Sequence, residues 1–144
     1  MSKEAARIVA LERAPDADDL GLGAGLRPVQ VQALSRIKAA GGGIVAAGVG
    51  HGKFLISILC PTVIIPQSKT ALLLVPPPLL QQTRDELAKW RKIYPVIDGL
   101  TVAAYSTLST MQGRRMLLDL APDLIVADEA HALRRLESAR TKRL

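Results

Sequence analysis

The stretch Leu124-Ile125-Val126-Ala127-Asp128-Glu129-Ala130-His131 decides the fold, together with the earlier stretch Ala47-Gly48-Val49-Gly50-His51-Gly52-Lys53. In the later stretch, an apolar run with β-branched residues is followed directly by two carboxylates, and the first of these, Asp128, lies 75 positions after Lys53. A strand that ends in Asp-Glu can hold Mg²⁺ through its first carboxylate and orient a water with its second, and a glycine loop surrounds phosphate oxygens with backbone N–H groups. The two stretches in this order predict a nucleotide-phosphate site.

The earlier stretch has the composition of a phosphate-binding loop. Its glycines let the backbone approach phosphate oxygens and adopt positive φ, and Lys53 adds a cation where a helix begins. We therefore expect phosphate contacts from Gly48, Val49, Gly50, His51, Gly52 and Lys53. The alternative is a plain glycine-rich turn between a strand and a helix. At His51 a partly exposed side chain is favoured over a catalytic one.

Composition indicates a small soluble protein with a basic balance. The 144 residues are 49% hydrophobic, enough for one α/β domain with a core, and no run approaches the roughly 20 apolar residues of a membrane span. Cys60 is the single cysteine and no signal-type apolar segment follows the first residues, so we expect a cytosolic protein without an intrachain disulfide. The net charge is +6, which favours a polyanionic partner.

Apolar periodicity and breaker residues divide the chain into alternating elements. We expect a flexible leader over residues 1–25 and one domain over residues 26–144, because prolines and glycines interrupt the leader. The spacing predicts helices over residues 28–41, 53–60, 79–93 and 108–118, and strands over residues 44–46, 71–75, 101–105 and 124–127. This alternation predicts a parallel sheet with helices on both faces. Trp90 has core spacing with Leu87 and Ile93, which favours packing over base stacking.

The two motifs resemble motifs I and II of superfamily 2 helicases and translocases, in the class that carries Asp-Glu-Ala-His. The resemblance implies a P-loop NTPase fold of the RecA-like kind, with ATP and Mg²⁺ as cofactors. It assigns Asp128 as a Mg²⁺ ligand and Glu129 as the base that polarises the attacking water. His131 would couple the nucleotide state to a neighbouring lobe, and Lys53 would act on the phosphates. The alternative is a solvated acidic pair at a strand end with an incidental histidine.

One position departs from the family pattern, A-x-x-G-x-G-K-T. The hydroxyl that follows the lysine is the direct Mg²⁺ ligand in the family, and Phe54 stands in its place. Ser57 lies one helical turn further on and would point away from the metal. The departure predicts weak binding of the Mg²⁺–nucleotide complex and slow turnover.

The stretch Leu26-Arg27-Pro28-Val29-Gln30 resembles the element ahead of motif I in translocases of the chromatin-remodeller type and their phage relatives. There the glutamine reads the adenine edge, because its amide can donate and accept at once. Gln30 is therefore the candidate for adenine selection. The alternative is an ordinary exposed glutamine on a helix.

Three further stretches resemble parts of the family that touch nucleic acid. Residues 72–80 resemble motif Ia and residues 104–109 resemble motif Ib, whose loops contact phosphates without sequence readout. Residues 133–142 resemble the basic turn after motif II. The candidate contacts are Pro76, Ser106, Thr107, Arg134 and Arg135. The alternatives are a rigid strand exit for the proline, helix N-caps for the two hydroxyls and a solvated helix face for the arginines.

The resemblance covers residues 26–144 and includes neither the motif III strand nor the second RecA-like lobe with the arginines of motif VI. It implies the ATP-binding lobe of a DNA-dependent ATPase in the cytosol of a bacterium or a phage-infected host, poorly active alone. DNA is favoured over RNA as a weak, sequence-independent partner, and a second chain or downstream segment would supply motifs III to VI. The alternative is a non-catalytic nucleotide- or nucleic-acid-binding remnant of such a helicase.

Overall fold

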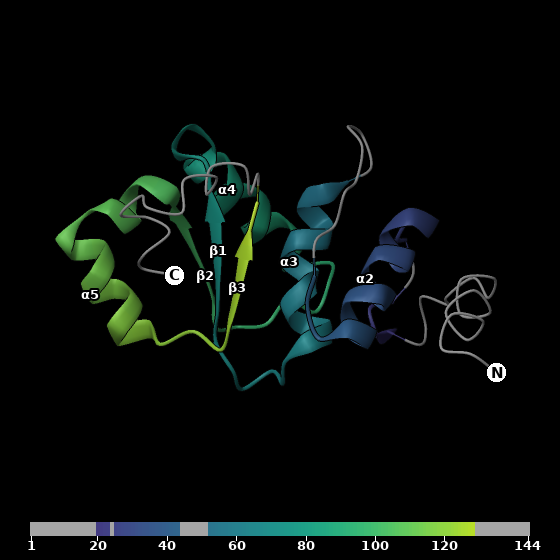
Figure 1. Cartoon of the computed structure of the whole chain (residues 1–144). Helices are drawn as coiled ribbons and strands as arrows, with labels where there is room; N and C mark the ends of the chain where they lie inside the picture. The colour runs from purple at the N-terminus through teal and green to yellow at the C-terminus, as the bar shows by residue number, and fades with distance from the viewer. Residues whose placement is uncertain (1–19, 24, 44–51, 129–144) are drawn as a thin grey trace.

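The computed structural model describes residues 20–23, 25–43 and 52–128, which form an α/β domain with a parallel sheet (Figure 1). The elements in chain order are α2 (Pro28–Ala40), α3 (Lys53–Ile64), β1 (Ala71–Val75), η2 (Pro77–Leu79), α4 (Leu80–Trp90), β2 (Leu100–Ala104), η3 (Tyr105–Ser109), α5 (Met111–Leu120) and β3 (Leu124–Ala127). The strand predicted over residues 44–46 lies outside the described residues.

The three strands are parallel and follow the order β2-β1-β3. Ala71 of β1 stands opposite Leu100 of β2 on one side and opposite Leu124 of β3 on the other. All five residues of β1 are buried, as expected for a leucine-rich strand that is covered on both faces. The strands predicted over residues 71–75 and 124–127 are confirmed, and β2 begins one residue before the predicted start.

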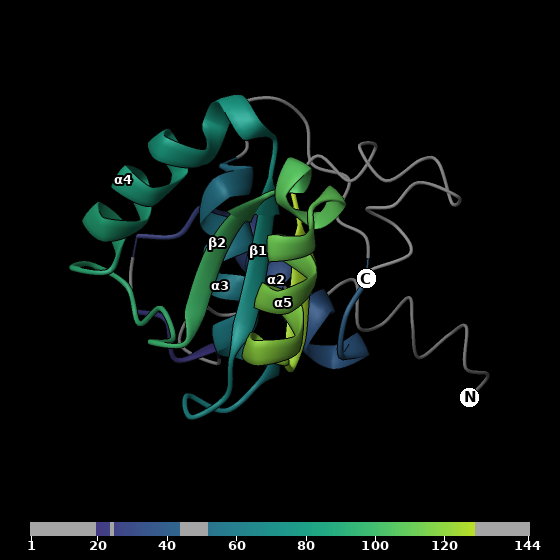
Figure 2. The ribbon, with the colours of Figure 1, turned by 90° about the vertical axis from the view of Figure 1, so that its left-hand side faces the viewer.

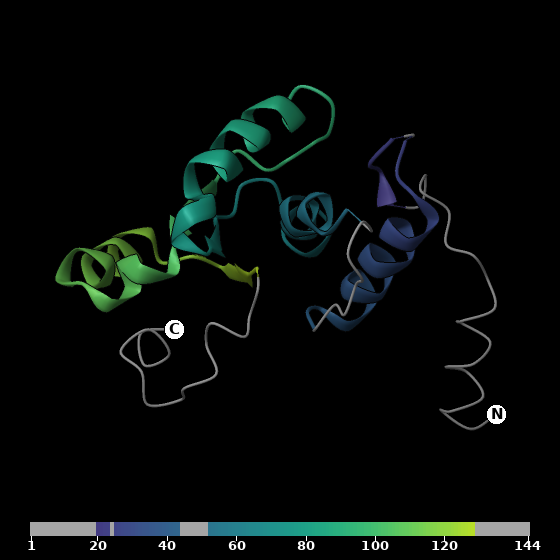
Figure 3. The same ribbon diagram turned by 90° about the horizontal axis from the view of Figure 1, so that it is seen from above.

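Helices cover both faces of the sheet, which confirms the predicted layering (Figure 2). On one face, Leu73 of β1 belongs to the larger core cluster with Leu59 of α3 and Leu87 of α4. On the other face, Leu74 belongs to a second cluster against which Leu117 of α5 packs. The alternation of side chains along β1 produces this division. The first helix, α2, packs on α3 and lies outside the layer that covers the sheet (Figure 3).

The helix α3 continues past its predicted end. The sequence predicted an end at Cys60 because Pro61 cannot donate an amide hydrogen, yet Pro61 lies inside the helix, which runs to Ile64. The hydroxyl of Thr62 donates to the carbonyl of Pro95 at 2.9 Å, and Pro61 is fully buried. Tertiary contacts therefore hold a turn that local propensity disfavours.

The predicted helices over residues 79–93 and 108–118 also have different limits. The helix α4 ends at Trp90, so Ile93 falls in a turn and is 62% exposed, and its predicted core position is wrong. The N-cap of α5 is Thr110, whose hydroxyl accepts from the amide of Gly113 at 3.0 Å. The N-cap role considered for Ser106 and Thr107 is therefore not taken at α5.

The packed part of the chain begins before the predicted domain start at residue 26. Leu22 is 2% exposed and belongs to the larger core cluster, and Leu20 packs against that cluster. A short apolar Leu-x-Leu pattern placed between glycines gave no periodic signal, which is why the sequence did not predict this contact. The leader residues 1–19 lie outside the described residues.

The two outer edges of the sheet differ. Arg84 donates to the carbonyl of Val102 at 3.5 Å, and Arg91 donates to the carbonyl of Leu100 at 3.4 Å. These carbonyls belong to β2, so Arg84 of α4 and Arg91, the C-cap of that helix, cover the outer edge of β2 with cations. Such a cover discourages pairing with another strand. Within the described residues, no strand pairs with the outer edge of β3.

Candidate functional site

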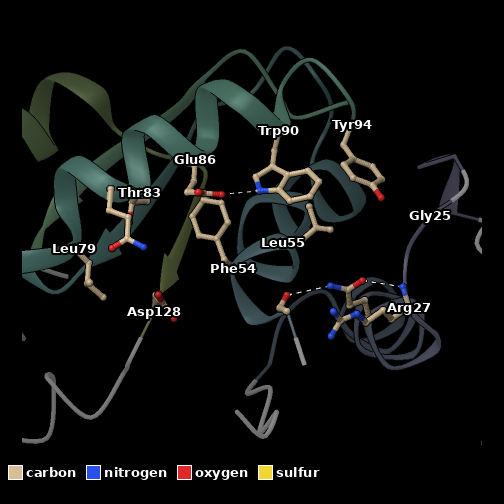
Figure 4. A pocket seen from close by; sticks show the side chains of 13 residues that line it. Gly25, Arg27, Phe54, Leu55, Leu79, Thr83, Glu86, Trp90, Tyr94 and Asp128 are labelled. Atoms are coloured by element: carbon tan, nitrogen blue, oxygen red, sulfur yellow. Dashed lines mark hydrogen bonds between the residues drawn. The ribbon is translucent and has the colours of Figure 1, made fainter. Parts of the chain in front are cut away.

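A cleft of about 540 Å³ opens between α2, α3 and α4, beside the end of β3 (Figure 4). Its volume falls in the usual range for sites that hold small molecules. The residues that line it are Gly25, Arg27, Gln30, Gly52, Phe54, Leu55, Leu79, Gln82, Thr83, Glu86, Trp90, Tyr94 and Asp128. Three of the predicted site residues, Gln30, Gly52 and Asp128, thus meet at one cleft although they span 98 sequence positions.

The N-terminus of α3 supplies one wall of the cleft. Gly52 is the N-cap in the left-handed conformation, with φ of 68°, and no side chain of the described residues caps the first turn. The first turn also contains no acidic residue, and Lys53 is its first residue. The free N–H groups and the positive end of the helix dipole make this terminus suitable for an anion.

Gln30 is buried, at 4% exposed, and its amide already has two partners in the chain. Its Oε1 accepts from the backbone N–H of Arg27 at 2.8 Å, and its Nε2 donates to the carbonyl of Gly52 at 3.3 Å. The amide therefore connects the start of α2 to the start of α3, and one lone pair and one N–H remain for a ligand.

Gly52 is required for the close approach of these two helix starts. A Cβ at this position would overlap the side-chain amide of Gln30, and the positive φ would strain any other residue. The glycine that the sequence assigned to phosphate contact therefore also allows α2 to meet α3.

Asp128 follows β3 and reaches the cleft from the sheet. Its backbone N–H donates to the carbonyl of Leu74 at 2.9 Å, and its carbonyl accepts from the hydroxyl of Tyr105 at 2.7 Å. These contacts fix the backbone of Asp128 from β1 and from η3. Tyr105 is fully buried, and apart from the resemblance of its segment to motif Ib no role was predicted for it.

Phe54 occupies the position at which the family has a hydroxyl. Its ring points into the cleft toward α4 (Figure 4), and it packs against the larger core cluster. The hydroxyl of Ser57 donates to the carbonyl of Lys53 at 3.1 Å, within its own helix. Ser57 is not among the residues that line the cleft, and its predicted orientation away from a metal stays a prediction.

The wall that α4 supplies was not predicted from the sequence. Leu79, Thr83, Glu86 and Trp90 line the cleft. Their spacing of three or four residues places them on one face of the helix, and this is the signal that could have revealed them. Trp90 is half-buried against the larger core cluster, which agrees with the predicted packing role, yet it lines the cleft as well.

Some of the remaining predicted residues lie within the described part of the chain and the others lie outside it. Lys53 is exposed at the start of α3. Pro76 follows β1, and Ser106 and Thr107 follow β2. Because these strands are parallel neighbours, all three residues lie at the carboxyl ends of the strands. The predicted residues outside the described part are Gly48, Val49, Gly50, His51, Glu129, His131, Arg134 and Arg135.

Asp128 is the carboxylate that the described residues offer for Mg²⁺ at the predicted position. Within residues 20–23, 25–43 and 52–128, no group of three or more potential ligands gathers around one point. Mg²⁺ in phosphate sites is commonly held by one or two carboxylates together with phosphate oxygens and water. Two carboxylates line the cleft, those of Asp128 and Glu86, and Asp128 is the one at the position predicted for a metal that arrives with a phosphate ligand.

A scan against protein-family models and searches of curated proteins and of solved structures found no match to this chain. Among the described helices, none is long and apolar enough to cross a membrane.

Proposed function

We propose that this chain is a RecA-like nucleotide-binding lobe of the helicase type, which binds the phosphates of ATP at the start of α3. The observation that carries the proposal is the meeting of Gln30, Gly52 and Asp128 at one cleft. The motifs that contain these residues were assigned to a nucleotide site from the sequence alone. The parallel sheet supports the same conclusion, as does the packing of α3, which follows the glycine-rich stretch in the sequence, against the core of that sheet.

The electrostatics of the α3 terminus support phosphate binding. Free backbone N–H groups, the helix dipole and the ammonium of Lys53 all favour negative charge there. Lys53 is exposed, so its side chain is able to reach a ligand in solution without a change in the core.

We propose further that the chain hydrolyses ATP slowly when it is alone. Phe54 offers no oxygen to a metal, and an arginine finger supplied from another lobe or chain contributes about 10³ to 10⁵ in rate in related chemistry. Glu129 would polarise the attacking water. Rapid DNA-stimulated turnover that Glu129→Gln abolishes would contradict this part of the proposal.

Calorimetry with ATP tests the phosphate site. Lys53→Ala should weaken binding roughly 10- to 100-fold, since a hydrogen bond to a charged group contributes about 1.5 to 3 kcal/mol. Lys92→Ala is the matched control, because Lys92 is an exposed lysine beyond the end of α4 and does not line the cleft. Equal ATP affinity for wild type and Lys53→Ala would refute the site.

A second function, weak binding of nucleic acid, is favoured by one observation. The segments after β1 and β2, which carry Pro76, Ser106 and Thr107, lie at the carboxyl ends of neighbouring parallel strands. Fluorescence anisotropy with duplex and single-stranded DNA, at about 50 and 200 mM salt, tests it because counterion release makes phosphate binding steeply salt-dependent over this range. Absence of binding at the lower salt would exclude this function and leave the nucleotide site.

A further inference from the structure

Thr83 is a buried polar residue in the wall of the cleft. It is 6% exposed and lines the cleft, and its hydroxyl makes no hydrogen bond with any described residue. Among the described residues, no side-chain polar atom is both fully enclosed and without a hydrogen-bond partner. The hydroxyl of Thr83 is therefore open to the cleft, where it can donate to a ligand or accept from one.

Glu86 lies one turn further along α4 and presents an acceptor beside this hydroxyl. Its Oε2 accepts from the indole N–H of Trp90 at 3.2 Å, and its other oxygen has no partner among the described residues. The indole contact holds the carboxylate against the wall of the cleft (Figure 4). An ionised carboxylate accepts hydrogen bonds and donates none, so a ligand group that faces it must be a donor.

Aromatic rings complete this part of the cleft. Phe54 reaches it from α3, Trp90 from the last residue of α4 and Tyr94 from the turn that follows. The ring centroids of Trp90 and Tyr94 are 5.8 Å apart. The wall from Leu79 to Trp90 is about 16 Å long at 1.5 Å per residue, which is long enough for a nucleoside and its first phosphates. A flat aromatic ligand with a polar edge fits this combination of surfaces.

We propose that α4 recognises the base of the bound nucleotide through a donor–acceptor pair formed by Glu86 and Thr83, and that Phe54 is the surface on which the base stacks. The base is a purine with an exocyclic amino group, which donates to Glu86 while the adjacent ring nitrogen pairs with the hydroxyl of Thr83. This inference rests on the proposed nucleotide site. It gives Phe54 a binding role at the position where the family has a metal ligand, and it leaves Gln30 as a positioning residue between α2 and α3.

Inosine triphosphate is the reference ligand for a test by calorimetry with the full chain. It differs from ATP by a keto group in place of the 6-amino group, and from GTP by the absence of the 2-amino group. A keto oxygen opposite the carboxylate of Glu86 leaves two acceptors facing each other. ATP or GTP should therefore bind at least about tenfold more tightly than inosine triphosphate, the lower limit for a hydrogen bond to a charged group. A preference for ATP over inosine triphosphate would identify the 6-amino group as the donor to Glu86, and a preference for GTP would identify the 2-amino group.

Substitutions in α4 should change this preference in a defined direction. Glu86→Gln keeps an oxygen for the indole of Trp90 and turns an N–H toward the ligand, so the preference should fall to parity or reverse in favour of inosine triphosphate. Thr83→Val should weaken the preferred nucleotide severalfold, since it removes the hydroxyl and keeps the shape. Asp85→Asn is the matched control, because Asp85 is exposed on the same helix and does not line the cleft.

The stacking role of Phe54 has its own readout. Phe54→Leu should weaken ATP severalfold and leave inorganic tripolyphosphate unchanged, because tripolyphosphate has no base. Trp90 is the only tryptophan of the chain and lies in the cleft wall, so its fluorescence should respond to ATP and not to tripolyphosphate.

These measurements separate the failure of this inference from the failure of the phosphate site. If tripolyphosphate binds in a Lys53-dependent manner while the triphosphates of adenosine, guanosine and inosine bind equally, the base site is refuted and the phosphate site remains. The base site is also refuted if Glu86→Gln and Asp85→Asn have the same effect on the preference. If neither tripolyphosphate nor any nucleotide binds, both proposals are refuted.

Discussion

The hydrogen bond between Tyr105 and the backbone of Asp128 connects the core to the edge of the cleft. The donor is the hydroxyl of a fully buried tyrosine in η3, and the acceptor is the carbonyl of Asp128 at 2.7 Å. Tyr105→Phe removes the hydroxyl and keeps the ring. The carbonyl that remains is partly buried and loses this donor, and Asp128 keeps its backbone contact with Leu74.

The expected loss of stability is about 1 to 2 kcal/mol, the range for the loss of a partly buried hydrogen bond. Urea denaturation followed by the fluorescence of Trp90 measures it. With a denaturant slope of about 1 to 2 kcal/mol/M, typical of a small domain, the midpoint should fall by about 1 M. The affinity for ATP should also fall, because the backbone of Asp128 loses its hydrogen bond with the hydroxyl of Tyr105 in η3.

Tyr94→Phe is the control for this measurement. Tyr94 is buried to a similar degree, and its hydroxyl has no hydrogen bond with any described residue. Its removal should shift the midpoint by less than about 0.3 M, since no partner is left unsatisfied. The reasoning about Asp128 is refuted if the two variants lose the same stability, or if Tyr105→Phe loses none.

Three further perturbations have directions that the structure determines. Gly113→Ala should destabilise the fold by about 1 to 3 kcal/mol in urea denaturation, because a Cβ there would overlap the backbone carbonyl of Thr107; unchanged stability would show that α5 can shift freely. Arg91→Met should lower the concentration at which the protein aggregates, measured by light scattering against Lys92→Met, because the carbonyl of Leu100 at the edge of β2 loses its cover. Burial raises the pKa of Cys60 to about 11, so iodoacetamide at pH 8 should modify it only as the protein unfolds.

The raised pKa of Cys60 also fixes a pH dependence. The thiol ionises near pH 9 in the unfolded chain and near 11 in the folded protein, so between these values the folded state binds more protons. The contribution of the protonated thiol to the free energy of unfolding is therefore present in full below about pH 9 and is lost as the pH rises toward 11. Cys60→Ala should therefore flatten the decline of the urea midpoint between pH 8.5 and 10.5, and an unchanged slope would contradict the assignment.

Local sequence patterns determined the strands and the first helix of the described region. The apolar runs at residues 71–75 and 124–127 form strands where predicted, and α2 begins at Pro28 and stops at Gly41, whose φ is 71°. These features depend on a proline, a glycine and apolar runs whose conformational preferences act within a few residues. The parallel, helix-covered sheet follows from their alternation.

Only the tertiary structure decided which side chains meet. Pro61 remains inside α3 because Thr62 is held by Pro95, 33 positions away, and the amide of Gln30 bonds to Gly52, 22 positions away. The face of α4 that closes the cleft is defined by its packing on β2 and α3, and no local preference encodes that orientation. The motifs in the sequence therefore predicted a phosphate site, whereas the wall that we propose for the base depends on the sheet order β2-β1-β3, which brings α3, α4 and the end of β3 to the same cleft.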